Sequence, residues 1–269
     1  MKRLVYLIAV AVSLTAFAQA SKPAQNAKPA PGVNWEGKVI QATGAGAPDM
    51  KAVNPAQARL GAERAAQMDA FRNLLAQVQG IQVSGGKTVG DMMASNDELK
   101  GRVSGTLRGF KVTAKRYFSD SGVEIDVEVP LSAISSAVSE AAAAPVASET
   151  AKGPAINTQG EKKNTGLVID ARGLKVSPAL APRVFSEDGK AFYTVEVLSD
   201  EARKSKGVAS YFKTLDQAQK SMLVGEKPVV VKATRADGSD LVLTAADVKK
   251  LTESNNSYLA EGRVAIVTN

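Results

Sequence analysis

The sequence predicts an α+β fold of two small domains, the first with a long helix packed on an antiparallel sheet. Residues 54–80 repeat small and apolar side chains every four positions, which is typical of a helix with one buried face. Residues 123–129 alternate between apolar and acidic side chains, as a half-buried strand does. Residues 141–165 lack an apolar period and separate two segments of about 105 residues, each long enough to bury a core. We therefore expect a first domain at 33–140, a linker at 141–165 and a second domain at 166–269.

The long helix carries residues suited to its two ends. Asn54 can accept hydrogen bonds from the free amides of the first turn, and Pro55 suits the first helical position. Gln57 can reach back toward the start of the helix. Gly80 is expected to end the helix in the left-handed conformation.

The inner face of this helix is mostly alanine, and Met68, Phe71 and Leu75 are expected to widen it in the C-terminal half. Its repeating positions are Ala58, Ala62, Ala66, Ala70, Leu74 and Val78. Alanine lets a helix approach a flat neighbour closely, so we expect this face to pack on the sheet. The alternative, that Ala62, Ala66 and Ala70 form a docking face for a partner, stays open.

Capping and turn residues predict the other elements. The box from Ser95 to Glu98 starts a short helix that should end near Gly101. The first domain is expected to hold strands at 35–44, 105–118 and 123–129 and a last helix at 131–138. The second domain is expected to be α+β as well, with strands at 166–171, 190–198, 227–233, 241–243 and 263–268 and helices that begin at Thr214 and Thr244.

The N-terminus has the pattern of a secretory signal peptide at residues 1–20. Lys2 and Arg3 precede an apolar stretch at 4–17, and Ala18-Gln19-Ala20 fits a cleavage site. The alternative is an uncleaved N-terminal anchor. The proline-containing residues 21–32 are expected to form a flexible lead. This pattern predicts export to the periplasm or cell envelope.

Cleavage after Ala20 is directly testable. N-terminal sequencing of protein from a periplasmic extract is expected to begin at Ser21. Recovery of intact Met1 in the membrane fraction would support the anchor instead.

The amino-acid composition excludes several kinds of functional site. The chain has no cysteine and no histidine, so disulfides, thiol chemistry, a lipidated cysteine and the commonest metal ligand are excluded. We expect no catalytic residues, no cofactor and no metal. The net charge of +7 is spread along the chain, which does not favour a nucleic-acid partner, and membrane contact should be at most peripheral.

Two short motifs have features of ligand sites. Ser84 to Thr88 lacks the first glycine of a phosphate loop, because residue 81 is isoleucine, so a glycine turn is expected there. Arg172 follows a predicted strand and is next to a glycine. In this position its guanidinium can bind an anion or a small ligand through two parallel hydrogen bonds. It can equally tie the loop to backbone carbonyls.

The acidic residues Glu124, Asp126 and Glu128 share one face of a predicted strand. Basic residues across the hairpin suggest a cross-strand charge ladder: Arg108, Lys111 and Lys115. Paired carboxylates also serve hydrolytic chemistry, so a carboxylate-dependent hydrolase remains an alternative.

Residues 33–140 resemble the lipoprotein-20 family of bacterial envelope proteins. The resemblance rests on ARLGAERAAQMDAFRNLLAQVQGIQV, on Thr88-Val89, and on GRVSGTLRGFKV and GVEIDVEVPL. Its most specific part is the helix ending, Asp69-Ala-Phe-Arg-Asn-Leu74 with Gly80. This chain departs from the lipoprotein members, which carry an acylated cysteine. The resemblance implies a soluble, non-enzymatic envelope or assembly module and brings no catalytic residues with it.

The expected function is therefore a structural or assembly role through contacts with envelope proteins, linked to outer-membrane or flagellar-motor structures. The identity of these partners, and whether the chain forms a homo-oligomer, stay open. A periplasmic module that binds a small ligand, centred on Arg172, is the other alternative.

Overall fold

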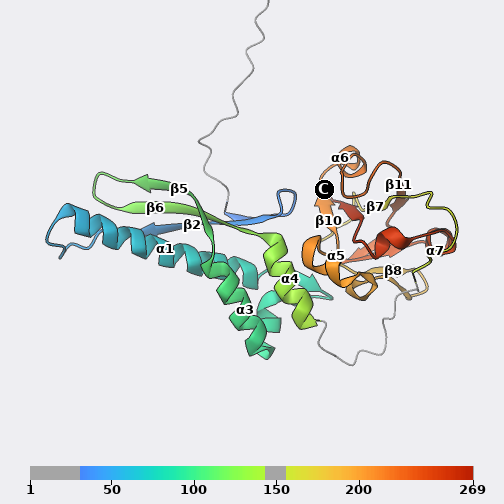
Figure 1. The fold of residues 1–269 in the computed structure, drawn as a ribbon, viewed down its shortest axis with the longest axis horizontal. Helices are drawn as coiled ribbons and strands as arrows, with labels where there is room; N and C mark the ends of the chain where they lie inside the picture. The colour runs from blue at the N-terminus through green and yellow to red at the C-terminus, as the bar shows by residue number, and fades with distance from the viewer. Residues whose placement is uncertain (1–30, 143–155, 269) are drawn as a thin grey trace, which may run out of the picture.

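The computed structural model describes residues 31–142 and 156–268. The predicted signal peptide and nearly all of the predicted lead lie outside these residues. Two small α+β domains are present, as predicted from the sequence (Figure 1). In the described part of the chain, no helix has both the length and the apolar character needed to cross a membrane.

The first domain is built on a four-stranded antiparallel sheet with the order β1-β2-β6-β5. Its strands are β1 (Gly32–Asn34), β2 (Val39–Gly46), β5 (Lys111–Tyr117) and β6 (Val123–Pro130). The helix α1 (Pro55–Gln79) runs along one face of this sheet (Figure 1). The predicted strand at 35–44 is wrong at its start, because residues 35–38 form the turn between β1 and β2.

The start of α1 is as predicted, and its end differs. The Asn54 side chain accepts a hydrogen bond from the Gln57 amide at 2.9 Å, and Gln57 Oε1 accepts from the Val53 amide at 3.3 Å. Gly80 has φ −77° and is not left-handed. Its amide donates instead to the carbonyls of the last helical turn, which ends the helix without a reversal of φ.

The alanine face of α1 lies directly on β2. All six predicted positions are buried: Ala58, Ala62, Ala66, Ala70, Leu74 and Val78. The opposing strand has glycine where the helix is closest. A Cβ at Gly44 would lie 2.7 Å from Ala70 Cα, and one at Gly46 would lie 2.7 Å from Ala66 N.

Ala62, Ala66 and Ala70 each have 0% exposure, so the docking-face interpretation of these residues is wrong. They are already in contact with the sheet and are not accessible to a partner. Met68 is 57% exposed and does not widen the stripe, whereas Phe71 and Leu75 pack at its margin.

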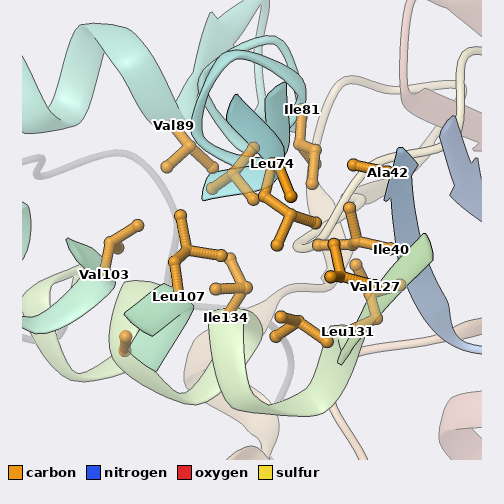
Figure 2. Packing of buried hydrophobic residues seen from close by; sticks show 14 of the residues in the cluster. Ile40, Ala42, Leu74, Ile81, Val89, Val103, Leu107, Val127, Leu131 and Ile134 are labelled. Carbon is orange, nitrogen blue, oxygen red and sulfur yellow. The ribbon is translucent and has the colours of Figure 1, made fainter. Parts of the chain in front are cut away.

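Three further helices close the first core. They are α2 (Val89–Ser95), α3 (Asp97–Arg108) and α4 (Leu131–Ala142). Val103, Leu107 and Ile134 meet Leu74 and Ile40 in the interior (Figure 2). The core is therefore made by helices from both halves of the domain.

The predicted break near Gly101 is wrong. Asn96 caps α3 by accepting from the Leu99 amide at 2.9 Å, and Ser95 ends the preceding helix. Residues 105–108, predicted as strand, are helical, because Leu99, Val103 and Leu107 form a buried stripe with helical spacing.

The second domain contains a parallel sheet with the order β10-β14-β7-β11. Its strands are β7 (Gly166–Asp170), β10 (Ser210–Phe212), β11 (Pro228–Lys232) and β14 (Val264–Val267). A second sheet has the order β12-β13-β8-β9, with β8 (Val184–Ser186), β9 (Ala191–Tyr193), β12 (Arg235–Asp237) and β13 (Asp240–Leu243). The helices are α5 (Asp200–Ser205), α6 (Leu215–Gln219) and α7 (Ala245–Glu253), with single 3₁₀ turns at Val195–Val197 and Ser257–Leu259.

Most predicted elements of this domain are present, and one is largely wrong. Thr214 and Thr244 cap α6 and α7 as expected. The strand predicted at 190–198 is limited to β9, after which the chain turns into a 3₁₀ helix and then α5.

The two domains are packed together by a segment of the second domain. The Leu180 and Ala181 amides donate to the carbonyls of Gln82 and Val83, each at 2.9 Å, beside β3 (Gln82–Ser84) and β4 (Lys87–Thr88). Leu180 is buried in the core of the first domain. The predicted linker at 141–165 begins within α4, and its end is bound to the second domain, where the Asn157 amide donates to Asn256 Oδ1 at 2.7 Å. Residues 143–155 lie outside the described residues.

Candidate functional site

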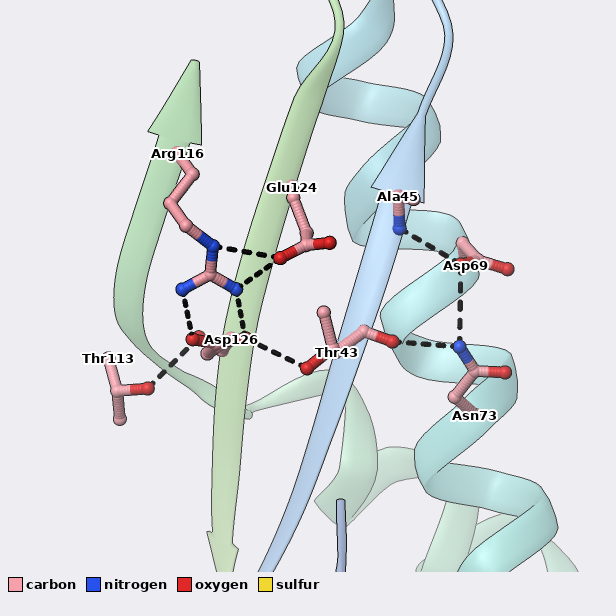
Figure 3. Close-up of polar contacts among 8 residues, drawn as sticks. All are labelled: Thr43, Ala45, Asp69, Asn73, Thr113, Arg116, Glu124 and Asp126. Atoms are coloured by element: carbon pink, nitrogen blue, oxygen red, sulfur yellow. Dashed lines mark hydrogen bonds and ion pairs between the residues drawn. The ribbon is translucent and has the colours of Figure 1, made fainter. Parts of the chain in front are cut away.

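The acidic residues of β6 alternate with buried apolar residues, so they share one face of the strand, and we call them the acid row. An arginine joins two of them, Glu124 and Asp126 (Figure 3). The Arg116 guanidinium is 2.5 Å from Glu124 Oε1 and 2.5 Å from Asp126 Oδ2. Asp126 is 0% exposed and also accepts from Thr43 Oγ1 at 2.8 Å. These carboxylates raise the pKa of Arg116 above its usual range.

A β-bulge explains why the partner is Arg116. Lys111 pairs with Glu128 at 3.2 Å, as the predicted ladder requires. The register then shifts between Val112 and Ala114, which brings Arg116 opposite Glu124. The other two predicted partners are wrong. Lys115 pairs with Glu63 of α1, and Arg108 lies in α3.

This arrangement does not favour acid–base catalysis. A carboxylate pair needs one member that holds a proton, but a shared guanidinium stabilises the ionised form of both. Within the described ranges, no group of three or more acidic residues is placed to hold a metal ion. The acid row is therefore best understood as an ion-pair network on the sheet.

Two residues of α1 close the free part of the β2 edge (Figure 3). Asp69 Oδ2 accepts from the Ala45 amide at 3.0 Å, and Asn73 Nδ2 donates to the Thr43 carbonyl at 2.8 Å. Both belong to the helix motif on which the family resemblance rests. In this fold they bind backbone groups that a further strand would otherwise use.

Arg172 follows β7, as predicted, but its guanidinium already has a partner. Its Nε and one terminal nitrogen contact the two carboxylate oxygens of Asp170 at 2.9 and 2.7 Å. This pair lowers the pKa of Asp170. A cavity of about 650 Å³ beside Arg172 is also lined by Lys232, Thr244 and Asp247. An anion there would compete with Asp170 for the bidentate face of the arginine.

The remaining motif has a structural role. Gly85 and Gly86 have φ +55° and +77° and make the turn that was expected from the sequence. Thr88 accepts from the Asp91 amide at 3.1 Å and, with the Asp91 side chain, caps α2.

Two cavities lie along the seam between the domains. The larger, of about 510 Å³, is lined by Val33, Trp35, Phe212 and Lys213 among others. The smaller, of about 160 Å³, lies between the β1–β2 turn, α4 and the chain leading into β10. Trp35 and Tyr211 line both and make an edge-to-face contact at 5.3 Å. The sequence did not indicate these cavities, because their walls come from both domains.

The connection from β2 to α1 and the turn between β5 and β6 lie at the end of the first domain that points away from the second domain (Figure 1). Several large apolar side chains of these segments are exposed. We call this end the apolar tip. It comprises Met50 (91% exposed), Val53 (87%), Leu60 (51%), Tyr117 (51%) and Phe118 (49%). Arg59 stacks over the Tyr117 ring at 5.5 Å, which brings the start of α1 beside the end of β5.

Comparison with known proteins bears on the second domain. No curated protein matches the chain. The resemblance of residues 33–140 to the lipoprotein-20 family stays a prediction. Residues 166–269 are similar to a family described as the second domain of Treponema pallidum Tp0624, and the match begins at the first residue of β7.

Proposed function

We propose that this chain is a non-catalytic, exported protein of the cell envelope with a structural or assembly role. The apolar tip is the observation that carries the proposal. Met50 and Val53 are almost fully exposed in a connection that leads into α1, where a soluble domain gains nothing from apolar side chains. We infer that the tip contacts an envelope protein. An outer-membrane or flagellar-motor structure is the setting that the family resemblance implies.

The shape of the first domain supports this proposal. β2, β5 and β6 place the residues of the tip at one end of the sheet, and the second domain packs at the other end (Figure 1). The second domain therefore does not cover the apolar tip, and the tip can contact a partner. The alternative of a hydrolase is less well supported, because Arg116 is bound to both Glu124 and Asp126.

Site-specific photocrosslinking in cells tests the proposal. A photoreactive phenylalanine analogue at Phe118 or Met50 is expected to give a discrete adduct with one envelope protein. The same analogue at Met222, which is 98% exposed in the second domain, is the control and should not give that adduct.

A second variant tests whether the contact is apolar. Val53→Asp should abolish the adduct formed from position 118 without loss of folding, because Val53 is 87% exposed. Equal adducts from positions 118 and 222, or an adduct unaffected by Val53→Asp, would contradict a role for the tip.

A further inference from the structure

We propose that the partner at the apolar tip adds an extended, acidic segment to β5 as a further strand of the first sheet. This inference rests on the function proposed above, because it names the kind of protein segment that the tip contacts. β5 is the last strand of its sheet, and it leads through Tyr117 and Phe118 into the apolar tip (Figure 1). The edge of β5 and the tip therefore form one continuous surface.

The backbone of β5 has free hydrogen-bonding groups on its outer side. The Phe118 amide donates to the Gly122 carbonyl at 3.0 Å, toward β6. Backbone groups alternate in direction along an antiparallel strand, so those of Arg116 also point to β6, and those of Lys115 and Tyr117 point outward. In the described part of the chain, no hydrogen bond outside the β5–β6 ladder reaches the backbone of Lys115 or Tyr117.

These free groups determine what kind of occupant fits. An extended chain presents donors and acceptors at the same spacing, so it can pair with a strand edge through its main chain alone. β5 alternates between exposed and half-buried residues along its whole length, and α1 packs mainly on β2 and β6. A strand can therefore pair with β5 without displacing one that is already there.

The side chains of β5 favour an acidic strand. The side chains of Lys111 and Lys115 are 75% and 39% exposed, whereas their carboxylate partners Glu128 and Glu63 are 24% and 21% exposed. The ammonium groups are therefore more accessible than the acids with which they pair. Each ammonium has three donors, so it can bind a second carboxylate from an added strand.

A second copy of β5 is a less suitable occupant. Residues 111–117 contain three basic side chains and no aspartate or glutamate. Pairing β5 with itself would therefore gather like charges along one edge, which is destabilising. Lysines on an edge strand are a common protection against self-association, and they leave the edge open to a strand of opposite charge.

Crosslinking from position 118 in cells tests the added strand. Lys115→Pro removes the outward amide and places the proline ring against the incoming strand, while an edge strand tolerates proline where its N–H faces solvent. The yield of the adduct should fall at least about tenfold. Lys115→Thr is the matched control, because it loses the same ion pair with Glu63 but keeps the amide, and its yield should fall only about threefold.

A charge reversal tests the acidic character of the partner separately. Lys111→Glu changes a highly exposed side chain and should lower the yield of the adduct at least about fivefold. Lys111→Arg keeps the positive charge and should restore the yield. These two variants leave every backbone group of β5 in place.

The possible failures can be told apart. Absence of a discrete adduct from position 118 in the otherwise unchanged chain would contradict the proposed function itself. A full yield in Lys115→Pro, with a urea midpoint that shows a folded protein, would overturn the added strand and leave the tip as the contact. An unchanged yield in Lys111→Glu, or an adduct with twice the mass of this chain, would overturn the acidic partner.

Discussion

Gly46→Ala is expected to destabilise the protein by about 3 kcal/mol, at the upper end of what overpacking costs. The new Cβ would overlap the Ala62 carbonyl oxygen and lie 2.7 Å from Ala66 N. Both are backbone atoms of α1, so no side chain can rotate away and the helix must move off β2. Urea denaturation of the mature chain, followed by circular dichroism, measures the loss.

A matched control lies on α1 itself. Gly61→Ala places a Cβ where no atom lies within 4 Å, and it adds a better helix former. This variant should be more stable by roughly 0.5–1 kcal/mol. If Gly46→Ala were as stable as Gly61→Ala, α1 would not be held as close to the sheet as described.

Arg116→Met is expected to be the other large loss, about 2–3 kcal/mol. It removes the guanidinium from Asp126, which is 0% exposed and also accepts a hydrogen bond from the Thr43 hydroxyl. Breaking a fully buried pair by removal of one partner costs about 3–5 kcal/mol. The lower value is expected because the Arg116 side chain is 34% exposed and water can replace part of it. The free energy of unfolding in urea checks this value.

Lys111→Met is the control on the same strand. It removes the partner of Glu128, but the lysine side chain is 75% exposed, so the loss should stay below about 0.5 kcal/mol. Similar losses in both variants would show that burial of Asp126 does not govern the effect.

The sequence predicted the parts of the fold that local chemistry determines. The caps at Asn54, Thr214 and Thr244 and the buried stripe of α1 are recognisable because each depends on spacing within one element. The helix through Gly101 was missed, because glycine is a weak helix former and the Leu99–Leu107 stripe outweighs it only once the core exists.

The candidate sites were harder to predict, because they depend on distant segments. A one-residue bulge places Arg116, and not the predicted Lys115, opposite the acidic residues of β6. No residue type in the sequence marks the position of that bulge. Trp35 and Tyr211 are brought together at the seam only by the packing of the two domains. Arg172 was correctly placed after a strand, but its pairing with Asp170 depends on rotamers that spacing alone does not determine.

The closed edge of the first sheet limits how copies of this protein can join. A sheet with two open edges can recruit strands on both sides and grow into a fibre. Here Asp69 and Asn73 occupy the backbone groups of Ala45 and Thr43 on one side, and β5 is the terminal strand on the other. On the first side only the three-residue strand β1 is left as an edge, so edge-to-edge pairing of copies through this sheet would favour β5 against β5 of a second copy about a twofold axis, which ends at a dimer.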